Sequence, residues 1–271
     1  MSHTFDDIPY RTIDGETLLG RLYRPTAQAA ALVVEVHGGA WTQNDRLTNV
    51  LMHEHLAEQG IAVFAIDFRM APKHRYPVAV RDINYAIRWV RSNLAALGLA
   101  PRLVGALGTS SGGHLATLAA IRPDDAMFVD HDPALGEANA RLDFLIACWP
   151  ILDPLARYHM ARARGLQNLV NNHHAFWADE TAMAEGNPFL NVDAGRATCM
   201  PPMLILQGTD DENVEHERTH AFANVYRSRG GRVEYHAFLG EPHAFVARNA
   251  GSEAANQALA RMSEFVHHQL A

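Results

Sequence analysis

A short run of glycine and serine separates an apolar segment from a helical one at residues 108–112, Gly-Thr-Ser-Ser-Gly. The apolar residues 103–107 before it predict a buried strand, and the small and apolar residues 113–121 after it predict a helix. Glycines on both sides of a serine remove side-chain clashes at a sharp strand-to-helix turn, so the serine oxygen projects from the sheet. The motif predicts a nucleophile at Ser110, although the pentapeptide taken alone is also an ordinary turn.

The rest of the chain alternates strand-like segments with amphipathic helical ones. Asp45 is predicted to cap a helix that runs to about Gln59, and Pro77 is predicted to open a longer helix. Strands that alternate with helices predict an α/β fold with a mostly parallel sheet, helices on both faces and right-handed crossovers. We expect a single domain over residues 1–271. Its expected strands are residues 16–24, 30–37, 61–67, 103–107, 144–148, 203–207 and 233–238.

One segment, residues 155–187, breaks this alternation. It contains several arginines and histidines and shows no strand pattern. We therefore expect a helical insertion that acts as a lid. Its aromatic residues Phe176 and Trp177 either wall a pocket or pin the insertion to the body of the protein, and the sequence leaves both readings open.

Two later loops supply the partners that a serine nucleophile needs. A serine hydroxyl reacts well only when a histidine takes its proton and a carboxylate orients that histidine. Because functional groups gather at the carboxyl ends of strands in such sheets, the acid is expected in residues 208–214 and the base in residues 239–245. We predict Asp211 as the acid, with Asp210 as the second choice, and His243 as the base.

A glycine turn follows the expected strand 30–37. Residues 37–41, His-Gly-Gly-Ala-Trp, can direct backbone N–H groups into the same site, where they would stabilise the oxyanion that forms when serine attacks a carbonyl. The backbone N–H of Ser111 is expected to join them. Two glycines after a strand are often only a tight turn, so this prediction depends on its pairing with the serine motif.

Four segments together resemble the hormone-sensitive-lipase-like branch of the α/β-hydrolases, and also its arylformamidase relatives. They are residues 37–41, 67–77, 108–114 and 241–243, and the resemblance spans about residues 30–250. It implies the α/β-hydrolase fold with a helical lid insertion.

The resemblance also assigns roles to single residues. It implies a triad of Ser110, Asp211 and His243. It places the oxyanion hole on the backbone N–H groups of Gly39, Ala40 and Ser111 and a structural arginine–aspartate pair on Arg69 and Asp82. The chain departs from the usual esterase pattern at two positions, where Ala40 replaces a glycine and Ser111 replaces an alanine. Ala40 moves the chain toward the formamidase-like pattern.

These residues lead us to expect a serine carboxylesterase that cleaves small to medium acyl or aryl esters through an acyl-enzyme. The alternative is an arylformamidase or amidase that acts on N-formyl or other activated amides. No cofactor and no metal are expected. The predicted apolar pocket is formed by Trp41, Met70, Trp149, Phe176, Trp177 and Phe245.

Two other classes of function compete with this hypothesis. Residues 216–220, His-Glu-Arg-Thr-His, match a zinc-binding pattern in which His216 and His220 share one helix face. The segment falls between the acid and base loops, where a packed connecting helix is the simpler reading. A ligand-binding receptor on the same fold is the other alternative, but the presence of all three triad residues favours an enzyme.

One carboxylate has no obvious role. Glu35 lies inside the otherwise apolar segment 30–37. A buried carboxylate needs a partner, for which Arg69 or a histidine could serve.

Charge and composition exclude several partners. The 271 residues carry 23 Lys and Arg against 30 Asp and Glu, a formal net charge of −7, and no long basic block. We therefore expect no binding to nucleic acid or to an anionic membrane surface, and a small-molecule ester or amide as substrate. The N-terminal residues 1–7 lack the pattern of a secretory signal, and the two cysteines form no framework, so a cytoplasmic protein is expected. The sequence does not decide between a monomer and a homodimer.

Overall fold

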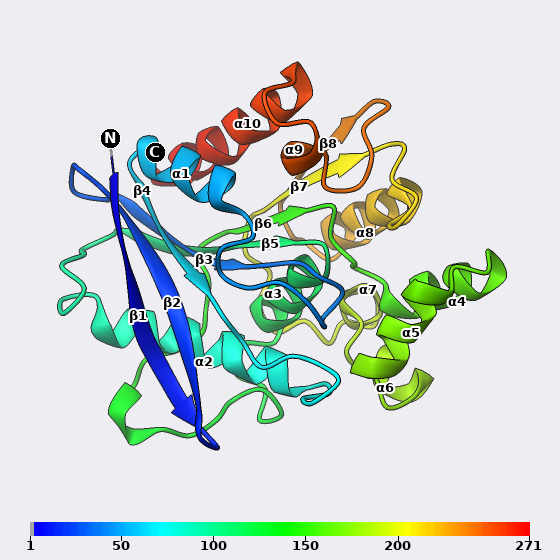
Figure 1. Ribbon diagram of the computed structural model, residues 1–271, viewed down its shortest axis with the longest axis horizontal. Coiled ribbons are helices and arrows are strands. Elements are labelled where there is room, and N and C mark those ends of the chain that lie inside the picture. The colour runs from blue at the N-terminus through cyan, green and yellow to red at the C-terminus, as the bar shows by residue number, and fades with distance from the viewer. Residues whose placement is uncertain (1–2) are drawn as a thin grey trace.

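The computed structural model describes residues 3–271 and contains one eight-stranded sheet (Figure 1). The first two residues of the N-terminal stretch considered above lie outside the described residues. The strands are β1 His3–Ile13, β2 Glu16–Pro25, β3 Ala31–Val36, β4 Ile61–Ile66, β5 Leu103–Thr109, β6 Leu145–Cys148, β7 Met203–Gly208 and β8 Val233–Phe238.

The sheet is mostly parallel, as predicted. Its strand order is β1-β2-β4-β3-β5-β6-β7-β8. Strands β3 to β8 pair in parallel, whereas β1 pairs with β2 and β2 pairs with β4 in the antiparallel direction. Strand β1 was not predicted, because its side chains are mostly exposed and it contains no apolar run. All seven predicted strands are present, with ends that differ by a few residues.

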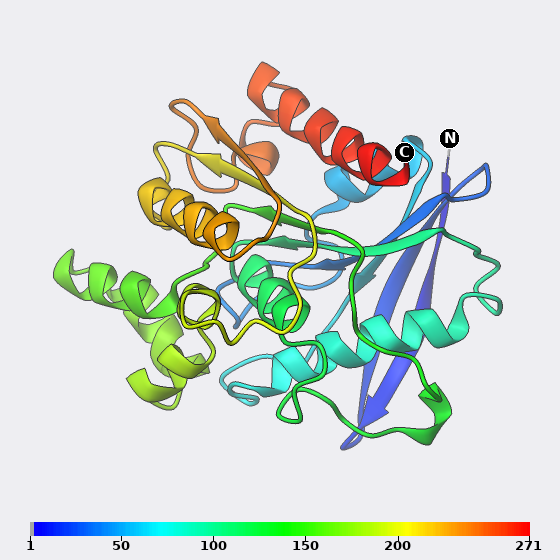
Figure 2. The same ribbon diagram turned by 180° about the vertical axis from the view of Figure 1, so that it is seen from behind.

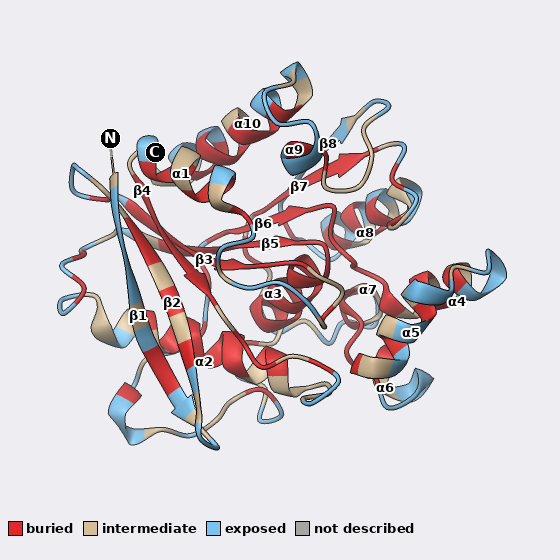
Figure 3. Cartoon of the chain, viewed as in Figure 1, coloured by how far each residue is buried: buried red, intermediate tan, exposed pale blue. Residues whose placement is uncertain are grey.

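Helices cover both faces of the sheet, which explains why the central strands are buried and mostly apolar (Figure 3). In β3, Leu32, Val34 and Val36 belong to the core on the face covered by α2, α3 and α8. Ala31 and Val33 belong to the core on the opposite face, under α1 and α10. Figure 2 shows the two helical layers from behind. The covering helices are α1 Val50–Glu58, α2 Val78–Asn93, α3 Ser111–Ile121, α8 His216–Ser228 and α10 Glu253–Leu270.

Helix α1 begins four residues later than predicted. Its N-cap is Asn49, and Asp45 lies in the preceding turn, where its carboxylate accepts the N–H of Leu47 at 2.8 Å. Asp45 therefore stabilises the loop after the glycine turn, and the prediction that it caps the helix was wrong. This loop places Asn49 close to the carboxyl end of β3.

The segment between β6 and β7 is helical. Figure 1 shows α4, α5 and α6 gathered at one side of the sheet, beyond the carboxyl ends of the strands. Short elements complete the fold. The helices of this segment and the remaining elements are α4 Pro154–Ala163, α5 Gln167–Phe176, α6 Glu180–Glu185, α7 Pro188–Asp193, α9 Phe245–Arg248 and the 3₁₀ turn Pro133–Leu135.

A buried ion-pair cluster joins the antiparallel strands to α2. Arg69 donates to both carboxylate oxygens of Asp82 at 2.9 Å, which is the pair implied by the family resemblance. Arg11 on β1 forms a further ion pair with Asp82 at 2.6 Å and another with Asp130.

None of the helices within residues 3–271 combines the length and apolar character needed to cross a lipid bilayer.

Candidate active site

Ser110 stands at the junction of β5 and α3 in a strained backbone conformation. Its φ is 52° and its ψ is −117°, values that L-residues seldom adopt. The turn is tight because a Cβ atom at Gly112 would lie 2.0 Å from the backbone oxygen of Val36. The N–H of Ser110 donates to the backbone oxygen of Cys148 on β6 at 2.9 Å. The side chain of Ser110 is thereby held at the carboxyl edge of the sheet.

Two hydrogen bonds connect Ser110 to a histidine and an aspartate from later loops. The Nε2 atom of His243 lies 3.0 Å from Oγ of Ser110, and its Nδ1 atom lies 2.7 Å from Oδ2 of Asp211. A carboxylate only accepts hydrogen bonds, so the Asp211 contact assigns the imidazole proton to Nδ1. Nε2 is then the nitrogen that can accept the serine proton.

Both carboxylate oxygens of Asp211 accept two hydrogen bonds each. Its Oδ1 atom accepts the N–H groups of Asn213 and Val214 at 2.9 and 2.8 Å. Its Oδ2 atom accepts Nε2 of Gln207 at 3.0 Å in addition to His243. Asp210, the second choice for the acid, is exposed and forms no hydrogen bond with His243. The backbone turn therefore directs one of the two neighbouring carboxylates inward.

The glycine turn after β3 reaches the same edge of the sheet. Gly39 has φ 113°, and a Cβ there would lie 2.1 Å from the backbone oxygen of Gln43, so only glycine is accommodated. Within residues 3–271, the N–H groups of Gly39, Ala40 and Ser111 have no protein acceptor. Three unpaired donors beside Ser110 match what an oxyanion hole at this serine would require.

The side chain of Ser111 ties the glycine turn to α3. Its Oγ atom accepts the N–H of Trp41 at 3.2 Å, and the side chain is buried. An alanine, which the family resemblance implies for this position, has no hydroxyl and could not make this bond. The substitution at residue 111 thus uses the side chain to fix the turn while leaving its own backbone N–H free.

Ser110 opens into a cavity of about 310 Å³. Side-chain amides and hydroxyls make up much of its wall, and Trp149 is the one member of the predicted pocket that lines it. Its lining includes Gly39, Ala40, Gln43, Asn44, Asn49, Trp149, Arg157, Leu169, Asn172, Asn213 and His243.

The other five predicted pocket residues do not line this cavity. Trp41, Phe176 and Trp177 are buried against one another, and the rings of Trp41 and Phe176 stack at 5.1 Å between centroids. They pin the helical segment to the glycine turn, which is the packing alternative left open by the sequence. Phe245 is buried beside Trp149, and Met70 packs against the core. Aromatic residues were expected in the pocket because apolar side chains in loops give the same pattern in a core as in a binding site.

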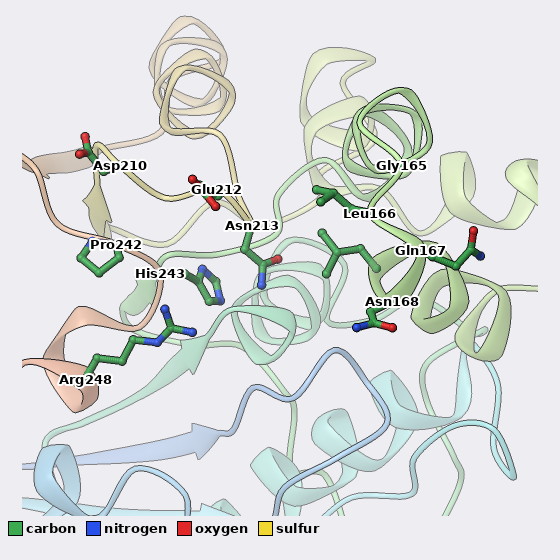
Figure 4. A pocket seen from close by; sticks show the side chains of 11 residues that line it. Gly165, Leu166, Gln167, Asn168, Asp210, Glu212, Asn213, Pro242, His243 and Arg248 are labelled. Carbon is green, nitrogen blue, oxygen red and sulfur yellow. The ribbon is translucent and has the colours of Figure 1, made fainter.

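A wider cleft of about 660 Å³ adjoins this cavity and shares His243, Leu169 and Asn213 with it. Figure 4 shows its walls: one comes from the start of α5 and the segment before it, and the others come from the loops after β7 and β8 and from α9. The cleft carries both signs of charge, a positive one from Arg248 and negative ones from Asp210 and Glu212. It offers a route from the surface to His243.

Glu35 has a histidine partner. The Nε2 atom of His53 lies 3.0 Å from Oε2 of Glu35, and Asn49 donates to Oε1 of Glu35 at 2.7 Å. The same amide of Asn49 lies 3.1 Å from the hydroxyl of Thr109, next to Ser110. Through Asn49, this buried group is hydrogen-bonded to the residue that precedes Ser110. Arg69 pairs with Asp82 and not with Glu35.

Arg157, Asn213 and Gln207 are site residues that the sequence did not indicate. Arg157 lies in a segment without a recognisable hydrophobic periodicity, so the sequence did not predict that its side chain points into the protein. Asn213 and Gln207 lie close to Asp211 in the chain. Their side-chain amides contact Arg157 and Asp211, respectively, only once the loop is folded.

Among the described residues, the two histidines of the zinc-binding pattern belong to no group of three metal-ligating side chains. His216 and His220 lie on α8, and the ring of His220 packs against Tyr235 at 5.2 Å. Across the part of the chain that the structure describes, no three His, Cys, Asp or Glu side chains converge as metal ligands.

Comparisons with known proteins agree with this fold. A probable carboxylic ester hydrolase of Mycobacterium tuberculosis, LipM, is 27% identical over 73% of this chain and 45% of its own length. Ethyl acetate hydrolase of Pseudomonas putida is 27% identical, over 97% of this chain and 82% of its own. The chain spans about half the length of several curated relatives that it matches, with shares of 45%, 62% and 54%.

Solved structures show the same architecture. A propionate-bound thermophilic esterase of Thermogutta terrifontis superposes with a TM-score of 0.76 at 26% identity, over 97% of this chain and 94% of that one. The predicted α/β-hydrolase fold is therefore confirmed. The family model described as BD-FAE matches residues 21–226, which is most of the sheet together with the serine turn and the acid loop. Since that match spans well over half of the sequence, the chain belongs to the BD-FAE family.

Proposed function

We propose that the protein is a serine carboxylesterase that cleaves small to medium carboxylic esters through an acyl-enzyme. The observation that carries this proposal is the pair of hydrogen bonds from Asp211 through His243 to Ser110. The free N–H groups of Gly39, Ala40 and Ser111 support it, because acyl transfer needs both an activated nucleophile and an oxyanion site.

In the first half of the reaction, Oγ of Ser110 attacks the ester carbonyl carbon while Nε2 of His243 takes the serine proton. The carbonyl oxygen becomes an oxyanion and accepts hydrogen bonds from the free backbone N–H groups. Asp211 stabilises the imidazolium that forms. The intermediate collapses, the C–O bond to the alcohol breaks, and His243 returns the proton to the leaving alkoxide.

In the second half, water replaces the alcohol. His243 takes a proton from the water as the oxygen attacks the acyl carbon, and the same N–H groups bind the second oxyanion. Collapse breaks the bond to Oγ of Ser110, and His243 reprotonates the serine. The carboxylic acid leaves and the free enzyme is restored without a cofactor.

Short acyl groups suit this site. A cavity of about 310 Å³ lies at the small end of the usual range for ligand pockets. The names of the relatives point the same way, since one is an ethyl acetate hydrolase and another was solved with propionate bound. We infer that acetyl to butyryl esters are better substrates than long-chain esters.

We further propose that residues 1–271 form one domain and that residues 155–187 act as its lid. The support is that α4 and α5 contribute Arg157, Leu169 and Asn172 to the cavity at Ser110. A cytoplasmic location stays a prediction from the sequence, which leaves the choice between a monomer and a homodimer open.

A covalent serine probe tests the assigned nucleophile. The folded protein is incubated with a fluorophosphonate, and the modified residue is identified by peptide mass spectrometry. We expect one adduct, on Ser110, because among residues 3–271 only this hydroxyl is hydrogen-bonded to His243. The neighbouring Ser111 provides an internal control, since its buried hydroxyl should stay unmodified. An adduct on another residue, or none in folded protein, would refute the proposal.

A further inference from the structure

Arg157 is a buried cation in the wall of the cavity that contains Ser110. It lies on α4, in the proposed lid, and the residue is 6% exposed. Among residues 3–271 it forms no ion pair with an Asp or Glu side chain. The charge of Asp211 raises the pKa of Arg157, but the oxygens of Asp211 are already bonded to His243, Gln207 and two backbone N–H groups.

Neutral acceptors alone hold the guanidinium in place. Nε donates to the backbone oxygen of Asn213 at 3.0 Å and to Oδ1 of the same residue at 3.2 Å, and Nη2 also donates to that Oδ1. Nη1 donates to Nε2 of His173 at 2.9 Å. A guanidinium has five N–H donors, of which these contacts use one on each nitrogen. One N–H on each terminal nitrogen has no acceptor among the described residues.

A buried positive charge without an acidic partner is costly. Burial lowers the pKa of Arg157 to about 10, and Asp211 opposes this shift only in part. A carboxylate accepts charge-assisted hydrogen bonds from a guanidinium, and each terminal nitrogen of Arg157 keeps one N–H group for such a bond. An anionic ligand in the cavity would therefore restore the missing counter-charge and fill both empty donor positions.

The rest of the cavity suits a polar guest. Its wall carries the side-chain amides of Gln43, Asn44, Asn49, Asn172 and Asn213, and no Asp or Glu is among its lining residues. Asp210 and Glu212 line the wider outer cleft instead. The inner cavity thus contains a cation and neutral donors close to the nucleophile.

We propose that Arg157 binds a carboxylate of the substrate, so that the preferred esters are short ones that bear a free carboxylate in their acyl or alcohol part. This inference rests on the proposed esterase function and names its substrate class. Arg157 then serves as a specificity-determining residue.

Two matched ester pairs test the proposal, because a carboxylate and a carboxamide have nearly the same shape. Monoethyl succinate is compared with ethyl succinamate for the acyl side, and 4-acetoxybenzoate with 4-acetoxybenzamide for the alcohol side. We expect kcat/KM of the wild-type enzyme to favour the carboxylate ester at least about tenfold in one pair, as a charge-assisted hydrogen bond allows. Equal values within both pairs would overturn the inference even without a variant.

Variants separate recognition from a structural role of the arginine. Arg157→Gln should bring the ratio of the preferred pair close to one, and Arg157→Lys should keep part of the preference. The matched control is Arg162→Gln, which removes an exposed positive charge from the same helix and should leave the ratio unchanged. If Arg157 only anchors α4 to Asn213, its replacement lowers kcat/KM for both members of a pair by the same factor, and the inference fails.

The outcomes also separate this inference from the proposed function. Hydrolysis of all four esters without preference would overturn the carboxylate site and leave the esterase in place. Hydrolysis of none of them would overturn both.

Discussion

Asp210 and Asp211 are adjacent in the chain but have different surroundings. Asp211 accepts four hydrogen bonds, including that of His243, while Asp210 faces solvent in the outer cleft. The sequence favoured Asp211 from its position in the loop but could not exclude its neighbour, because the direction of each side chain depends on the folded turn.

Replacing each aspartate by asparagine should separate their roles. In Asp211→Asn the amide can donate to His243 and favours the wrong imidazole tautomer, so kcat for a short neutral ester should fall by about 10³- to 10⁴-fold. Asp210→Asn makes the same chemical change one residue away and should keep a rate close to that of the wild type. Steady-state kinetics on both variants measures the contrast. Equal losses in the two variants would contradict the assignment of the acid.

Other residues of the site show where sequence reasoning stops. Ser110 and His243 could be predicted because each lies in a short motif at the end of an apolar strand. Arg157 and Asn49 could not, since Arg157 lies in a segment without a clear pattern and Asn49 lies in the part of a predicted helix that is a loop in the structure. The hydroxyl of Ser111 seemed only a departure from the family pattern, and its bond to the glycine turn became visible in the folded structure.

At the scale of elements, buried histidines join the proposed lid to the body. Nε1 of Trp41 donates to Nδ1 of His114 at 3.1 Å, and Nε2 of His114 lies 2.8 Å from the backbone oxygen of Gly186. On α5, His173 accepts from Arg157 within the lid, and its ring packs against Trp41 of the body at 5.1 Å between centroids. These bonds, with the stacked Trp41 and Phe176, explain why aromatic residues of the lid are packed inside rather than presented to substrate.

Both histidines should make the fold sensitive to acid. The ordinary pKa of a histidine is 6.5, and burial lowers that of His114 to about 4. The pKa of His173 is lowered to about 2, mainly by burial and to a smaller extent by the positive charge of Arg157. Below pH 6.5 the unfolded chain therefore binds more protons than the folded one, and stability is lost as pH falls. Between pH 7 and pH 5 the free energy of unfolding should drop by about 2 kcal/mol for each histidine.

Denaturant unfolding at pH 7 and pH 5 measures this loss. His114→Gln should reduce the difference between the two pH values, because one of the buried titrating groups is gone. His267→Gln removes an exposed histidine on α10 and is the matched control. The same free energy of unfolding at both pH values would show that these histidines are not held neutral by burial.

At the scale of the whole molecule, the sheet brings four distant segments to one edge. The turns after β3, β5, β7 and β8 carry the candidate oxyanion donors, Ser110, Asp211 and His243, and the parallel direction of these strands places all of them on the same side. The alternation of apolar strands with helices was enough to predict this layout. Strand β1 escaped prediction because it lies at the edge of the sheet, where exposed polar side chains hide its pattern.

The central claim is that this shared edge performs serine-dependent ester hydrolysis. Its most direct test is kcat/KM for a short neutral ester, such as phenyl acetate, in the wild type and in Ser110→Ala, with the unfolding midpoints compared as a control for folding. We predict an unchanged midpoint and a loss of kcat/KM of at least about a thousandfold. A folded Ser110→Ala protein that keeps kcat/KM within about tenfold of the wild type would contradict the claim.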